Sequence, residues 1–192
     1  MCEEEETQEN PEIFRGRLMH FVLIRLGNET YREHRDVCVS RAIELANQNG
    51  HTYSIVTDVE RDRYIKPHDL RSPLCSVSEL SDIVRFKMAC EIPDLLYLDT
   101  DCYLRSIPVF DKKDKPYFVF GDIFIFYVNN CCNMFSEWLD RRRKKFMGSA
   151  TWFFHAIDYF NECYIIPDAC YVHGFFTTQG IRAGLQRLEV VR

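Results

Sequence analysis

Two short apolar runs with a helical pattern between them are the strongest constraint on how this chain folds. The runs cover residues 18–24 and 53–56. Residues 29–49 carry apolar side chains along one helical face and are followed by Gly50, a common helix stop. The order strand, helix, strand predicts a parallel sheet with a right-handed crossover. We therefore expect an α/β fold.

Length and composition support one folded domain. The chain has 192 residues, of which 46% are hydrophobic and 14% aromatic, enough for a packed core. Residues 1–11 are acidic and polar and predict a disordered tail, so that residues 12–192 form a single domain. The formal net charge of −5 argues against nucleic acid as a partner.

The cysteines and the first residues of the chain indicate the cellular compartment of the protein. The nine cysteines are an odd number and form no pair of Cys-x-x-Cys motifs, which favours reduced thiols over a disulfide scaffold. The first residues are acidic, unlike the basic start of a signal peptide. No apolar run approaches the roughly 20 residues of a transmembrane segment. These features predict a cytoplasmic protein without a membrane span.

An apolar run at residues 95–98 ends in two aspartates, Asp99 and Asp101. Side chains two residues apart on a strand point the same way, with Cα atoms roughly 7 Å apart. Both carboxylates can therefore converge on one divalent cation that holds an anionic ligand. The alternative is a solvated turn at the end of the strand.

A helix upstream adds a second pair of charged residues. Ser76 and Glu79 fit a capping box, and the helix is expected to run to about residue 90. Asp82 and Arg85 lie three residues apart on one face of it. Their alternative role is an ordinary i,i+3 ion pair on the surface.

The second half of the chain is expected to complete the sheet and its helices. Residues 60–75 predict a loop with a short helix. Residues 117–128 predict one long or two short strands with a bulge near Gly121. Further elements are expected as helices at 131–145 and 149–162 and a short strand at 164–167. The basic run 141–145 fits either a solvated helix end or a surface for an anionic acceptor.

Taken together, these motifs resemble the glycosyltransferases with the DXD sugar-binding motif, which have the GT-A fold. The resemblance is carried by Ser81-Asp82-Ile83-Val84-Arg85-Phe86 and Leu96-Tyr97-Leu98-Asp99-Thr100-Asp101. The opening residues 20–27 are also similar to the first strand of that family. The family often has a Tyr-Gly-Gly turn before the DXD strand, whereas this chain has residues 90–94 with a proline there.

The resemblance implies a single GT-A (Rossmann-like) domain with a mostly parallel central sheet flanked by helices. It implies that Asp101 binds Mn²⁺ or Mg²⁺ directly and that Asp99 binds the ion through water or contacts the ribose. His173 is similar in position to a late histidine that completes the metal or diphosphate site in some of these enzymes. Asp82 and Arg85 would hold the donor. An ordinary loop or core position is the alternative for His173.

The strand ends at Ile24, Arg25 and Asp58 would line the pocket for base and ribose. Asp122 and Asp158 are candidates for a base that activates the acceptor, with a capping or turn role as the alternative. The implied activity is transfer of a hexose from a nucleoside-diphosphate sugar to a hydroxyl of a glycan or glycoprotein, with a UDP-sugar favoured and a GDP-sugar as the other donor.

Two other functions compete with this one. The first is a catalytically silent GT-A domain that binds a nucleotide or a partner. The second is a haloacid-dehalogenase-like phosphatase, whose nucleophile motif is also an apolar strand ending in Asp-x-Asp. That motif normally lies on the first strand, whereas Asp99 follows a complete strand-helix-strand unit.

Overall fold

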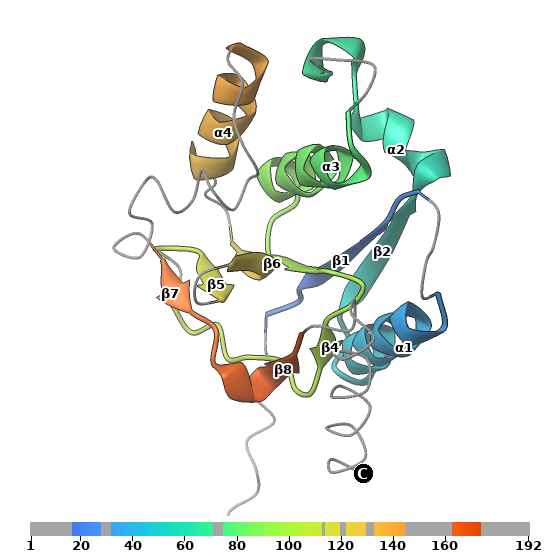
Figure 1. The fold of residues 1–192 in the computed structure, drawn as a ribbon. Helices are drawn as coiled ribbons and strands as arrows, with labels where there is room; N and C mark the ends of the chain where they lie inside the picture. Colours follow the sequence, from blue (N-terminus) through green and yellow to red (C-terminus); the bar gives the residue numbers. More distant parts are fainter. Residues whose placement is uncertain are drawn as a thin grey trace, which may run out of the picture.

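The computed structural model describes residues 17–27, 32–70, 75–112, 114–119, 122–129, 133–144 and 163–173. A six-stranded sheet forms the centre, with α1 on one face and α2, α3 and α4 on the other (Figure 1). The sheet contains, in the order β2-β1-β3-β6-β5-β7, strands Thr52–Thr57, His20–Arg25, Leu95–Leu98, Asp122–Val128, Tyr117–Val119 and Tyr164–Ile165. A small second sheet pairs β4 (Tyr103–Leu104) with β8 (Tyr171–Val172). The helices are α1 (Arg32–Gln48), α2 (Asp58–Tyr64), α3 (Val77–Glu91) and α4 (Asn133–Lys144), with short 3₁₀ helices η1 (Pro67–Asp69) and η3 (Asp168–Cys170).

One strand of the central sheet runs against the others. β1 pairs in parallel with β2 and β3, and β7 pairs in parallel with β5. β6 is antiparallel to both of its neighbours, β3 and β5. The predicted α/β fold with a mostly parallel sheet flanked by helices is thus confirmed. The arrangement brings the carboxyl ends of β1 and β3 to the edge where β6 begins.

The sheet separates two apolar layers because successive side chains of a strand point to opposite faces. On β1, Val22 and Ile24 pack in one layer with residues of α3 and α4. Phe21 and Leu23 pack in the other layer with residues of α1. Tyr97 of β3 belongs to the first layer, so its ring lies on the α3 side of the sheet.

Two helices begin at capping boxes. Ser76 caps α3, its Oγ accepting from Glu79 N at 3.2 Å while Glu79 Oε2 accepts from Ser76 N at 2.9 Å, as predicted. Thr57 and Glu60 form the same motif at the start of α2. That helix begins directly after β2, earlier than the loop expected at 60–75, because Thr57 ends the strand and caps the helix at once.

The turn before β3 depends on Asp94. This residue has φ 54°, in the left-handed region that favours glycine. Its carboxylate accepts a hydrogen bond from Tyr127 Oη at 2.7 Å and pairs with Arg17 Nε at 2.5 Å. These contacts hold a strained backbone at the place where the family often has glycines.

The structure tests some of the other predictions, whereas others concern residues outside the described part of the chain. His20 lies between the hydroxyls of Thr52 and Ser54, at 2.7 and 2.9 Å, so its imidazole has structural partners. Of the basic run, Arg142 is only 4% exposed, so the expected solvated helix end is wrong for that residue. The tail 1–11 and the helix 149–162 lie outside the described residues. Within the described part, no helix has the length and apolarity to cross a bilayer.

Candidate active site

A cavity of about 290 Å³ lies at the carboxyl ends of β1 and β3, beside the first turns of α3. Its apolar lining comes from Ile24, Leu26 and Val77, and its polar lining from Arg35, Ser78, Ser81, Asp82, Arg85, Asp99, Thr100 and Asp101. Ligands of open α/β sheets bind at this edge. The cavity lining therefore combines apolar side chains with three carboxylates, those of Asp82, Asp99 and Asp101.

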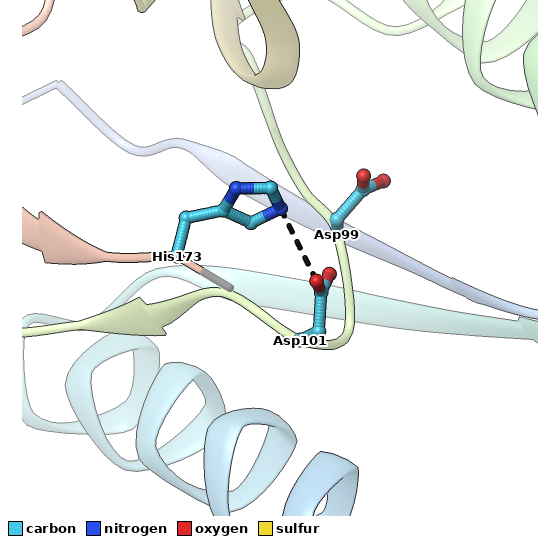
Figure 2. Close-up of side chains that lie close together, drawn as sticks. All are labelled: Asp99, Asp101 and His173. Atoms are coloured by element: carbon cyan, nitrogen blue, oxygen red, sulfur yellow. Dashed lines mark ion pairs between the residues drawn. The ribbon is translucent and has the colours of Figure 1, made fainter. Parts of the chain in front are cut away.

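Asp99, Asp101 and His173 come together at this edge (Figure 2). One potential ligand atom from each lies within 4.8 Å of the others. The small sheet explains the convergence, because β4 follows Asp101 and β8 precedes His173, and the two strands pair antiparallel. His173 Nε2 lies 3.1 Å from Asp101 Oδ2, an ion-pair distance if the imidazole is protonated. The structure thus brings together all three residues expected at the metal.

The carboxylate of Asp101 is buried, and its ion-pair contact among the described residues is with His173. The residue is 1% exposed, and no described residue donates a well-aligned hydrogen bond to either oxygen. An uncompensated buried carboxylate is costly, and such groups are found paired or bound to metal. Two carboxylates and an imidazole form a donor set for a divalent cation. The site therefore fits the metal that the sequence predicted.

Asp99 is held more tightly by the protein than Asp101. Its Oδ1 accepts a hydrogen bond from Tyr97 Oη and lies 3.5 Å from Arg85 Nη1. Its backbone N–H donates to the carbonyl of Phe124 at 2.8 Å. Burial and the charge of Asp101 raise the pKa of Asp99 to about 6, against the opposing effect of Arg85.

Arg85 is enclosed by its partners in the cavity wall. Its guanidinium donates a hydrogen bond to the carboxylate of Asp82. It also lies 5.2 Å from the ring centre of Tyr97 and 5.3 Å from that of Phe86. Burial disfavours its charge, but Asp82, together with Tyr97 and Asp99, raises the pKa of Arg85 above its ordinary value. Asp82 and Arg85 form the i,i+3 pair considered above, but it is buried at the cavity rather than exposed on the surface.

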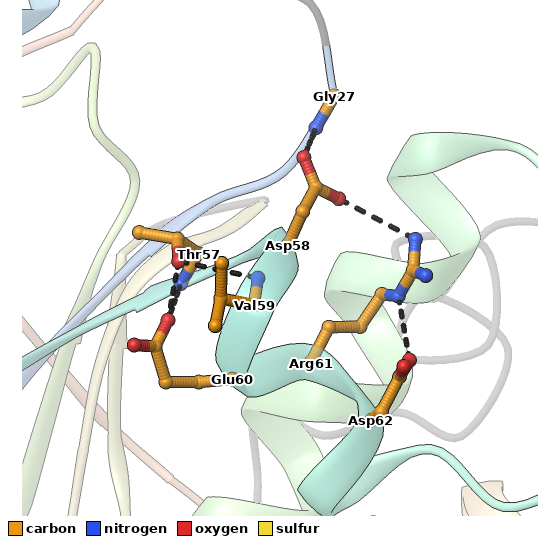
Figure 3. A network of polar contacts seen from close by, with 7 residues as sticks. All are labelled: Gly27, Thr57, Asp58, Val59, Glu60, Arg61 and Asp62. Atoms are coloured by element: carbon orange, nitrogen blue, oxygen red, sulfur yellow. Dashed lines mark hydrogen bonds and ion pairs between the residues drawn. The ribbon is translucent and has the colours of Figure 1, made fainter.

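The remaining predicted donor residues lie in different surroundings. Ile24 lines the cavity, whereas Arg25 and Asp58 are not among its lining residues. Arg25 Nη1 pairs with Asp36 Oδ1 at 2.9 Å. Asp58 Oδ2 accepts from Gly27 N at 2.9 Å, and its Oδ1 lies 3.4 Å from Arg61 Nη1 (Figure 3). Asp58 thus holds the loop that leaves β1.

Both candidate bases stay predictions. Asp122 begins β6, and its side chain lies outside the described residues, as does the whole of Asp158. Lining residues that sequence reasoning missed include Arg35, Ser78 and Ser81. Ser81 stands in the motif that carries the family resemblance, so its hydroxyl was identifiable, whereas Arg35 carries no local signal.

The sheet order, with β6 antiparallel to both of its neighbours in the described part of the chain, matches a GT-A fold. The structure resembles a crystal structure of a glycosyltransferase involved in the glycosylation of the major capsid of PBCV-1, with a TM-score of 0.58 and 11% sequence identity over 88% of this chain and 99% of that one. It is also similar to the galactosyltransferase LgtC, solved with donor and acceptor sugar analogs, with a TM-score of 0.48 and 12% identity over 77% of this chain and 73% of that one. No protein-family model and no curated protein sequence matches this chain.

Proposed function

We propose that this protein is a metal-dependent glycosyltransferase. It would transfer a hexose from a nucleoside-diphosphate sugar, a UDP-sugar in preference to a GDP-sugar, to a hydroxyl of a glycan or glycoprotein. The fold supports glycosyl transfer, and the cavity at the carboxyl ends of the strands supports a nucleotide ligand. We also propose a cytoplasmic location, which the free thiols of Cys38, Cys75, Cys102 and Cys170 favour.

The buried carboxylate of Asp101 carries this proposal. No described residue donates a well-aligned hydrogen bond to it, His173 Nε2 lies 3.1 Å from its Oδ2, and Asp99 completes the cluster. A purely structural aspartate would be expected to have such donors. The group makes physical sense when a cation completes its surroundings, and a diphosphate is the kind of anion that such a cation holds.

The residues divide into those that would meet the ion and those that would hold the donor. Asp101 and His173 are the proposed direct ligands, and Asp99 would bind the ion through water or contact the ribose. When bound, the ion would neutralise charge on the departing nucleoside diphosphate as a Lewis acid. Asp82 would accept a hydrogen bond from a hydroxyl of the donor sugar. Arg85 would hold the carboxylates of Asp82 and Asp99 in place.

The donor set favours Mn²⁺ over Mg²⁺. Mg²⁺ prefers a shell of oxygen atoms at short distances, whereas imidazole nitrogen suits transition metals. The apolar lining residues Ile24, Leu26 and Val77 would pack against the nucleobase.

Isothermal titration of the full chain with UDP-hexoses and GDP-hexoses, with and without Mn²⁺, tests the proposal. We expect binding that requires Mn²⁺ and is lost in Asp101→Asn. Asp62→Asn is the matched control, because Asp62 is exposed, pairs with Arg61 and lies outside the cavity. Release of nucleoside diphosphate in the presence of sugar acceptors then tests turnover.

The outcomes separate the competing functions. Nucleotide binding that is unchanged without Mn²⁺ and in Asp101→Asn would contradict the proposal of a metal-dependent enzyme. Metal-dependent binding without hydrolysis or transfer would favour the silent GT-A domain. Turnover of a phosphomonoester that depends on Asp99 would favour the phosphatase.

A further inference from the structure

Phe124 contacts two of the three groups at the candidate metal site, one through its backbone and one through its ring. It lies in β6, where its carbonyl accepts the hydrogen bond from Asp99 N at 2.8 Å. Its ring stacks on the imidazole of His173, with ring centres 3.7 Å apart and planes 7° from parallel. The backbone contact fixes the chain at Asp99, and the ring contact bears on the orientation of His173.

The ring of Phe124 is itself held in place. The residue is 9% exposed and belongs to the apolar layer on the α1 side of the sheet. Tyr171 packs edge-on against it, with ring centres 5.4 Å apart at 71°. The hydroxyl of Tyr171 in turn donates to Asp168 Oδ1 at 2.6 Å. Because these neighbours restrict the Phe124 ring, it offers His173 a fixed surface.

His173 needs such a surface more than Asp101 does. Its side chain is 32% exposed, whereas that of Asp101 is 1% exposed. It follows β8, a strand of two residues, which is the regular structure that adjoins it in the described part of the chain. A histidine that binds a metal is usually oriented by a neighbouring group that does not itself bind the metal. Loss of that group weakens the affinity for the metal.

We propose that Phe124 is a positioning residue for His173, whose imidazole plane is set by the face of the Phe124 ring. This inference rests on the proposed metal site. The stack keeps Nε2 directed toward Asp101 and removes rotamers in which the imidazole turns away, so less freedom is lost when an ion binds.

The variant Phe124→Leu in the full chain tests the role. Leucine leaves the backbone bond to Asp99 and an apolar side chain in place but removes the flat ring. We expect the affinity for Mn²⁺ alone, measured by isothermal titration, to fall by about 3- to 10-fold, the range for an aromatic contact. Phe124→Tyr keeps the ring and should restore the wild-type affinity.

Phe118→Leu is the matched control. Phe118 is fully buried in β5 and packs against Phe126 rather than His173. It should lose stability, as any large-to-small core change does, without a change in Mn²⁺ affinity. Comparison of the two variants therefore separates an effect on Mn²⁺ affinity from a general loss of stability.

Proton NMR of the metal-free protein gives a measurement that needs no metal. Stacking on Phe124 should shift the His173 ring protons upfield, with the signals assigned by their loss in His173→Gln. The shift should disappear in Phe124→Leu, and its absence from the wild-type protein would overturn the proposal even if Phe124→Leu does not fold. Wild-type protein that fails to bind Mn²⁺ would refute the metal site, whereas equal affinities for wild type and Phe124→Leu would refute only the role of Phe124.

Discussion

Arg142 of α4 and Glu79 of α3 form an ion pair between the two helices, with 3.3 Å between Nη2 and Oε1. The other oxygen of Glu79 accepts the backbone hydrogen bond that caps α3 at Ser76. The Arg142 guanidinium lies 5.8 Å from the ring centre of Trp138. One carboxylate therefore closes the start of α3 and fastens it to α4. Because the first turns of α3 line the cavity, this pair supports the cavity wall.

Arg142→Met should lower the free energy of unfolding by about 1–2 kcal/mol, because it leaves Glu79 without its buried partner. The neighbouring Arg141 is the control, since it is exposed and pairs with Glu137 within the same helix. Arg141→Met should change stability by no more than about 0.5 kcal/mol. Urea denaturation measures both, and equal losses would show that the pair with Glu79 has no special weight.

Asp101→Asn should make the metal-free protein more stable while destroying the site. It replaces a buried carboxylate that receives no well-aligned hydrogen bond from the described residues, and that has His173 Nε2 3.1 Å away, with a neutral amide. We expect a gain of about 1–2 kcal/mol in the free energy of unfolding measured in EDTA. Added Mn²⁺ should raise the melting temperature of the wild type but not of Asp101→Asn. A loss of stability in EDTA would mean that the ion pair with His173 outweighs the cost of burying the Asp101 carboxylate.

Gly27→Ala should be more costly than Gly50→Ala, although both glycines have similar positive φ values of 77° and 71°. A Cβ at Gly27 would lie 2.9 Å from Val77 Cγ2, whereas one at Gly50 would meet nothing within 4 Å. Backbone strain should cost each variant about 1–2 kcal/mol, with a further loss at Gly27 from the contact. Thermal unfolding compares them. Adding Val77→Ala to Gly27→Ala should recover the extra loss, and a failure to do so would exclude the contact as its cause.

Asp94→Ala should destabilise the protein by about 2 kcal/mol, since alanine tolerates φ 54° poorly and loses both side-chain contacts. Asp94→Asn should lose only about half as much, because asparagine adopts left-handed backbone readily and can still accept from Tyr127. Chemical denaturation of the two variants tests this. An equal loss in both would assign the effect to the ion pair with Arg17.

The local signals in the sequence were sufficient for the elements that carry the site. Ser76 and Glu79 identified the start of α3 because a capping box needs only residues three apart. The alternation of a strand placed Asp99 and Asp101 together. The expectation that His173 joins them came from the family resemblance, and the structure brings it beside them through the pairing of β4 with β8.

Features that depend on distant contacts were not predictable in this way. Arg142 stands among four other basic residues, and only Trp138 and the facing Glu79 explain why it is buried. Asp58 was expected at the donor, but the fold brings the backbone N–H of Gly27 to it. The direction of β6 follows from its pairing with β3 and β5, which no local pattern in residues 122–128 reveals.

The pairing of β4 with β8 has a consequence for the time at which the site can form. Asp99 and Asp101 leave the ribosome well before His173, and they meet it only when β8 returns to β4. A cation bound across this interval would close a long loop, the case in which a cross-link restricts the unfolded chain most. Uptake of the ion would therefore come late in synthesis. It would distinguish a completed chain from a truncated product that still contains both aspartates.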